Sequence, residues 1–228
     1  MTKHLRKYAD HGFHEVEGWV DPNIFKFLKF LADLEINNSL DGVLEIGVHH
    51  GKFFILLRSL LESNAHSVAI DVFDRQDLNI DSSGSGSLVR FKHSLSLYDP
   101  WTGQGVVIRE EDSTCLSTPL NGSFRFVSID GGHDREHVIS DLRLTEQVLA
   151  PNGVVIVDDF ARADWIGVTE GVLHYLEAGG VLVPFAAGYN KLFMARMSYV
   201  NRYRELVGNS TFHVKAQRFS RYSYSIVK

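Results

Sequence analysis

Two stretches decide the fold of this chain: FVSIDGGH at residues 126–133 and VVIVDD at residues 154–159. Each is a short run rich in Val and Ile that ends abruptly in aspartate, a pattern typical of buried strands in a parallel sheet. Ligands of open α/β sheets bind at the carboxyl ends of such strands. We therefore expect three carboxylates and one histidine to meet at one edge of a sheet: Asp130, Asp158, Asp159 and His133.

Strand and helix patterns alternate along the rest of the chain. Strands are expected at residues 43–47, 67–71, 106–108, 124–129, 154–157, 181–183 and 191–195. Helices are expected at about residues 24–34, 52–62, 133–149 and 165–177. This alternation predicts an α/β fold with one doubly wound, mostly parallel, seven-stranded sheet in a single domain.

The chain divides further by the character of its segments. We expect an N-terminal helical segment over residues 1–40, a core over residues 41–200 and a C-terminal tail over residues 201–228. Residues 74–88 (DRQDLNIDSSGSGSL) are polar and rich in Gly and Ser, which indicates a mobile surface loop.

Composition narrows the class of protein. Of 228 residues, 44% are hydrophobic and 22% charged, which is ordinary for a globular protein, and the net charge of −5 argues against a nucleic-acid partner. No run approaches the roughly 18 apolar residues of a membrane-spanning helix. The lone Cys115 fits a reducing compartment. We expect a cytoplasmic protein without a membrane partner, whose oligomeric state, a homo-oligomer included, is left open.

A glycine turn marks a second candidate site. EIGVHHG at residues 45–51 joins a strand to a helix, and its glycines let the backbone approach a ligand closely. Asp71 ends the next strand, where an acid can accept hydrogen bonds from ribose hydroxyls. Asp112 and Ser113 follow the third strand, where they could lie near a base. The alternative is that the glycines only shape the turn and that Asp71 faces water.

Taken in order, the segments LEIGVHHG, AID, EEDS, SIDGGH and VIVDD cover about residues 40–160. In this order the chain resembles the class I S-adenosylmethionine-dependent methyltransferases, which have a Rossmann-like fold. It is most similar to metal-dependent sugar O-methyltransferases of the macrocin and mycinamicin type, through IDGGH followed by VDD and through VEGW at residues 16–19.

The resemblance implies S-adenosylmethionine as cofactor and a methyltransferase core at residues 41–200. It places Glu45, Gly47 and Gly51 against the methionine part of the cofactor. It also places Asp71 on the ribose, with Asp112 and Ser113 near the adenine, and we count Asp130 among the cofactor-binding residues too.

The clustered acids also predict a metal. Carboxylates this close repel one another unless a cation lies between them, and Mg²⁺ or another hard divalent cation is the natural candidate. The resemblance implies that the ligands are Asp130, Asp158 and Asp159. His133 could take a proton from an acceptor hydroxyl, because the ordinary pKa of histidine is near neutrality. We expect an O-methyltransferase acting on a small hydroxylated molecule, such as a sugar or a glycosylated natural product.

Other interpretations stay open. Asp130 could cap the following helix, Asp158 and Asp159 could be a solvated pair, and His133 could have no chemical role. The cluster could belong to an iron-dependent hydroxylase, although that site needs two histidines and one carboxylate. The chain could also bind S-adenosylmethionine without catalysis.

Four further residues receive no chemical role. We expect His49 and His50, beside the glycine turn, to be structural, and Trp19 to be a packing residue. Lys191 is expected to lay its stem on the sheet and to keep its charge in water.

Overall fold

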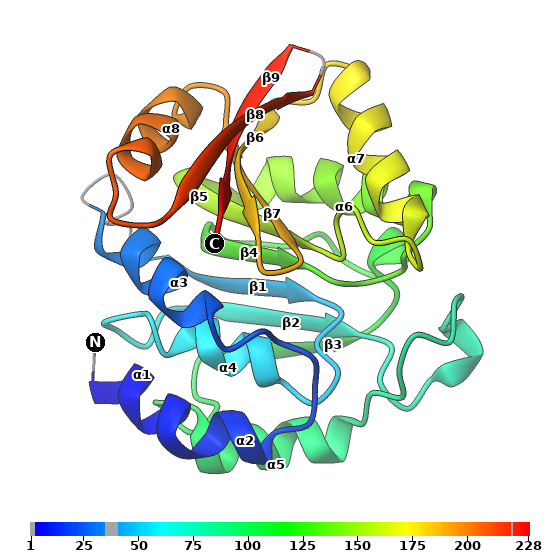
Figure 1. The fold of residues 1–228 in the computed structure, drawn as a ribbon. Coiled ribbons are helices and arrows are strands. Elements are labelled where there is room, and N and C mark those ends of the chain that lie inside the picture. The colour runs from blue at the N-terminus through cyan, green and yellow to red at the C-terminus, as the bar shows by residue number, and fades with distance from the viewer. Residues whose placement is uncertain (1–2, 35–40, 220) are drawn as a thin grey trace.

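A nine-stranded mixed sheet runs through the molecule, with helices on both faces (Figure 1). The structure, a computed structural model, describes residues 3–34, 41–219 and 221–228. The strands are β1 (Gly42–Ile46), β2 (Ser67–Asp71), β3 (Val106–Glu110), β4 (Phe124–Ile129), β5 (Leu149–Asp158), β6 (Leu182–Gly188), β7 (Lys191–Arg196), β8 (Val214–Phe219) and β9 (Tyr222–Val227). The α-helices are α1 (Lys3–Lys7), α2 (Phe13–Glu15), α3 (Ile24–Asp33), α4 (Lys52–Arg58), α5 (Leu88–Tyr98), α6 (Arg135–Val148), α7 (Ile166–Glu177) and α8 (Val200–Gly208).

The strands lie in the order β3-β2-β1-β4-β5-β7-β6-β9-β8. The first five are parallel, and β7 runs antiparallel to both β5 and β6. The doubly wound, mostly parallel α/β fold is confirmed. The expected count of seven strands is wrong, because the C-terminal residues add β9, parallel to β6, and β8, antiparallel to β9.

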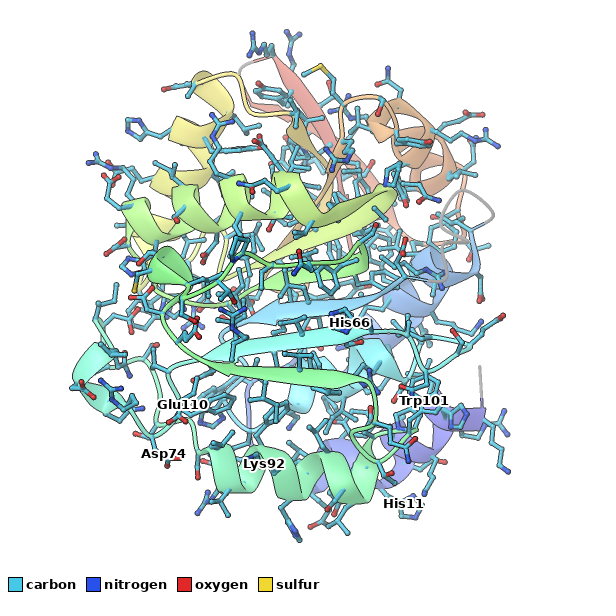
Figure 2. All side chains as sticks on the ribbon, turned by 180° about the vertical axis from the view of Figure 1, so that it is seen from behind. His11, His66, Asp74, Lys92, Trp101 and Glu110 are labelled. Carbon is cyan, nitrogen blue, oxygen red and sulfur yellow. The ribbon has the colours of Figure 1, made fainter. Side chains whose placement is uncertain are left out.

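Helices cover both faces of the parallel half of the sheet. In Figure 1, α3 and α4 lie in front of the sheet, while α6 lies in front of it in the reversed view of Figure 2. The helix α4 contacts β1 and buries all of its residues except Lys52, and the ring of Phe54 packs against Phe91 of α5. The helix α5, which the sequence did not predict, lies beside the β3 edge. Within the described part of the chain, no helix is long and apolar enough to cross a membrane.

The core is continuous across the parallel strands. In β1, β4 and β5, nearly every residue is buried, since both faces of these strands are covered. Register brings their ends level, with Ile46 opposite Ile129 and Ile129 opposite Val157. The residues that follow these strands therefore emerge side by side at one end of the sheet. Figure 2 shows that end on the side of Glu110 and Asp74, away from His66.

Gly47 makes this close approach of β1 and β4 possible. Its φ is 82°, and a Cβ at this position would lie 1.8 Å from the backbone oxygen of Asp130. The neighbour is backbone between two paired strands, so a side chain has no room there. The glycine is thus required by the fold as well as by the turn.

We predict that Gly47→Ala destabilises the protein by about 2–5 kcal/mol, the sum of a left-handed backbone and an overpacked contact. Urea unfolding measures the change. Gly208→Ala is the matched control, because among the described residues nothing lies within 4 Å of a Cβ added there. Equal stability of the two variants would contradict the prediction.

Candidate active site

A cavity of about 370 Å³ opens at the carboxyl ends of the parallel strands. It is lined by eight of the predicted site residues in addition to Asp130: Glu45, Gly47, Asp71, Asp112, Ser113, His133, Asp158 and Asp159. One surface of the cavity is the glycine turn and another is the acidic cluster. The two candidate sites of the sequence are therefore one site.

Asp71 fixes the glycine turn. Its carboxylate accepts backbone N–H hydrogen bonds from Val48 and His49 at 2.7 Å each and from Phe73 at 2.5 Å. Burial raises the pKa of Asp71, although these three hydrogen bonds oppose the rise. A carboxylate has about four acceptor positions, so Asp71 can accept a further hydrogen bond.

Gly51 is the one predicted cofactor-binding residue that lies away from the cavity lining. It does not line the cavity, and a Cβ there would lie 2.7 Å from the ring of Phe91. Gly51 is the N-cap residue of α4 and has a left-handed backbone with a φ of 90°. Gly51 therefore lies at the turn and against Phe91 rather than on the cavity lining.

Asp112 and Ser113 lie where β3 ends. Asp112 Oδ1 accepts hydrogen bonds from the backbone and the hydroxyl of Thr114, both at 2.8 Å, and Oδ2 lies 3.6 Å from His137 Nε2. Burial opposes the charge of Asp112, but these partners lower its pKa. The carboxylate is therefore held charged beside the cavity.

His133 is surrounded by carboxylates. Its Nδ1 lies 2.7 Å from Asp81, and its Nε2 lies 3.3 Å from Asp159 and 3.8 Å from Asp130. The ring stacks on Trp165 with centroids 4.3 Å apart. Asp81 comes from the loop at residues 74–88, so this loop reaches the site and fixes its histidine.

These contacts set the charges of the cluster. Burial opposes protonation of His133, yet the hydrogen bonds with Asp130, Asp159 and Asp81 raise its pKa to about 10. Burial, helped by the charge of Asp158, raises the pKa of Asp130 to about 7. In this state His133 holds a proton, whereas a base must be free to accept one.

Lys191 supplies a second cation, which the sequence analysis missed. Its expected solvated charge is wrong, because Lys191 is 3% exposed and its Nζ pairs with Asp158 Oδ2. The antiparallel register of β5 and β7 places the two residues opposite each other, and the ammonium lies 4.5 Å from the ring centroid of Phe53. Although burial opposes its charge, Asp158 and Asp130 raise the pKa of Lys191.

Glu45 is the most buried acid of the site. It is 1% exposed, and its Oε2 has no hydrogen-bond partner within the described ranges. Burial, followed by the charge of Asp130, raises its pKa well above the ordinary value. Glu45 therefore favours its protonated form, and Asp158 is the acid that pairs with Lys191.

The side chains of the acidic cluster have the atoms and the spacing that a divalent cation needs. Asp130, His133 and Asp159 each offer an atom within 4.8 Å of the others, a fit for a cation with two oxygen ligands. Both carboxylate oxygens of Asp158 have partners within the protein. Its Oδ2 pairs with Lys191, and its Oδ1 accepts hydrogen bonds from the backbone N–H of Asp159 at 2.8 Å and from Asn190 at 3.2 Å. Asp159 also has partners, because its Oδ1 accepts from Asn190 and lies 3.2 Å from Arg162 Nη1. Of the three predicted ligands, Asp130 and Asp159 are the two whose atoms form the group with His133.

This fold and site define a Rossmann-like methyltransferase, and comparisons with known proteins support that class. Residues 44–160 match the model of a family described as a methyltransferase domain, and this chain belongs to that family. No curated protein matches the sequence.

Three solved structures share the fold. The O-methyltransferase NovP superposes with a TM-score of 0.60 at 15% identity, covering 75% of this chain and 78% of NovP. CalS11, a TDP-rhamnose 3′-O-methyltransferase of calicheamicin biosynthesis, gives 0.55 at 15% identity, covering 76% and 78%. An O-methyltransferase from Bacillus cereus in complex with SAH gives 0.54 at 17% identity, covering 85% and 90%.

We predict that the charge of His133 makes stability depend on pH. The pKa of about 10 in the folded protein exceeds the ordinary value of about 6.5, so the stabilisation is complete below about pH 6.5 and is lost as the pH rises toward 10. The slope from one proton is at most about 1.4 kcal/mol per pH unit. Urea unfolding in chelator between about pH 6 and 10 should show a flatter profile for His133→Gln. The exposed His93→Gln is the control, and equal slopes for wild type and His133→Gln would refute the prediction.

We predict that Lys191→Met lowers the free energy of unfolding by about 3–5 kcal/mol at neutral pH, because it leaves Asp158 charged and buried. The double variant Lys191→Met with Asp158→Asn should regain part of this loss, since it removes the unpaired charge. Chemical denaturation of the two variants measures both effects. A loss no smaller in the double variant than in the single one would show that the ion pair is not the cause.

Proposed function

We propose that this protein transfers the methyl group of S-adenosylmethionine to a hydroxyl of a small molecule, with a divalent cation, Mg²⁺ foremost, at its acidic cluster. One observation carries the proposal: the glycine turn and the cluster of Asp130, His133 and Asp159 face the same cavity. A cofactor bound at the turn would thus lie beside the groups that can hold and deprotonate an acceptor.

The cofactor side of the cavity supports the proposed contacts. Glu45 and Gly47 are proposed to contact the methionine part of S-adenosylmethionine and Asp71 its ribose. Asp112 and Ser113 are proposed to lie near the adenine, beside the end of β3. Gly51 is proposed to act only by shaping the turn, because it lies against Phe91.

Asp130 and Asp159 are proposed to hold the cation, with Asp158 kept in place by Lys191. A bound divalent cation lowers the pKa of an acceptor hydroxyl and fixes its position. His133 is proposed as the base. Asp81 holds its Nδ1, so that Nε2 faces Asp130 and Asp159 and is the nitrogen that would accept the hydroxyl proton. The imidazole can do so only after it has lost the proton that the carboxylates now stabilise.

The acceptor is proposed to be a sugar or a glycosylated natural product. The support is the fold shared with CalS11, which acts on TDP-rhamnose, together with the IDGGH and VDD segments at the sheet edge. A hydroxylase at this cluster is not favoured, because Asp130, His133 and Asp159 include only one histidine and the iron site needs two. We further propose that the protein acts in the cytoplasm and without a nucleic-acid partner.

Calorimetry with S-adenosylmethionine, with and without Mg²⁺, is the first test. Binding would establish the cofactor and justify a screen of hydroxylated acceptors, with methyl transfer read by mass spectrometry. Absence of binding under both conditions would refute the methyltransferase proposal. Binding without transfer to any acceptor would favour a non-catalytic protein.

We predict that Asp159→Asn lowers turnover by about a hundredfold or more, since a bound cation contributes several kcal/mol to catalysis, while S-adenosylmethionine binding is kept. Excess chelator should lower wild-type turnover in the same way. The control is Asp33→Asn, an exposed change on α3. Full activity of Asp159→Asn, or of wild type in chelator, would refute the metal role.

A further inference from the structure

We propose that Glu17, His49 and His50 form a second metal site, for a late first-row divalent ion such as Zn²⁺. Glu17 comes from the segment that precedes α3, and the histidines come from the glycine turn. Each residue offers one ligand atom, and these atoms lie within 4.8 Å of one another. Two imidazoles and one carboxylate suit first-row transition ions, Fe²⁺ and Zn²⁺ among them, rather than Mg²⁺, and such donors bind Zn²⁺ more tightly than Fe²⁺.

The distance between Glu17 and His50 fits two ligands of one ion. Glu17 Oε2 lies 3.4 Å from His50 Nδ1, longer than the roughly 2.7–3.2 Å of a hydrogen bond. Two ligands on a tetrahedral Zn²⁺ with bonds of about 2.0–2.1 Å are separated by about 3.3–3.4 Å. The pair is therefore spaced for coordination.

The histidines also have unsatisfied nitrogens. His50 is 4% exposed, and neither of its ring nitrogens has a hydrogen-bond partner among the residues that the structure describes. Within the same residues, Nδ1 of His49 is likewise buried and without such a partner. Leaving a buried polar atom unpaired costs about 1–3 kcal/mol, and a coordinated metal would remove part of this cost.

Arg90 competes for the carboxylate. Its Nη1 lies 2.8 Å from Glu17 Oε2, but the two side chains are 66% and 59% exposed. An exposed pair of this kind contributes only about 0.2–1 kcal/mol, so an ion can displace Arg90 at little cost.

Such an ion would connect the N-terminal segment that carries Glu17 to the glycine turn. Glu17 and His49 both line the cavity. The expectation that Trp19 packs in the interior is wrong, because its ring is exposed and lies 5.3 Å from that of His49. Three protein ligands leave a coordination position open, as in catalytic zinc sites. The metal would thus hold the segment that carries Trp19 over the glycine turn.

The test is calorimetric titration of the full chain with Zn²⁺ in the presence of excess Mg²⁺. Wild type should bind one ion, and Glu17→Gln should weaken that binding by about tenfold or more, as loss of a ligand requires. Glu15→Gln, an exposed change two residues away, should leave it unchanged. Arg90→Gln should tighten it by up to about fivefold, because the competitor is gone.

Asp159→Asn separates the two metal sites, and it should keep Zn²⁺ binding because Asp159 is not a ligand of this ion. No binding to wild type, or equal affinity in wild type and Glu17→Gln, would overturn the proposal. Binding that is lost in Asp159→Asn but kept in Glu17→Gln would assign the ion to the acidic cluster and would also overturn it. These outcomes do not depend on methyl transfer.

Discussion

The buried ion pair between Asp158 and Lys191 is the interaction on which the site depends. Parallel strands bring their carboxyl ends level, so acids that follow neighbouring strands are forced together in a region of low dielectric. The neighbouring strand on the other side of β5 compensates this repulsion, because the antiparallel β7 places the ammonium of Lys191 opposite Asp158. With Asp158 paired to Lys191, Asp130 and Asp159 are the acids of this cluster that lie beside His133.

The strand ends were predictable because their signal is local. A run of Val and Ile that stops at Asp marks the carboxyl end of a strand. Together with the glycine turn and the order of the motifs, this signal led to ten predicted site residues, of which nine line the cavity. Gly51 is the exception, since a glycine that approaches a ligand and a glycine that packs on Phe91 look alike in sequence.

The partners of these residues could not be predicted in the same way. Lys191 and Asp81 reach the site from segments 33 and 52 residues away from the groups they bind, and their role depends on strand register and loop path. The strands β8 and β9 were missed for a related reason. They extend an edge of the sheet and are only partly buried, so no continuous apolar run marks them.

The contact between Asp81 and His133 links the position of a loop to the pKa of the site histidine. Asp81 is one of three carboxylates that keep His133 protonated, and it is the one carried by the loop at residues 74–88. Any molecule that displaces this loop to enter the cavity also withdraws a negative charge from the imidazole. Displacement of the loop and release of the histidine proton are then thermodynamically linked, each favouring the other.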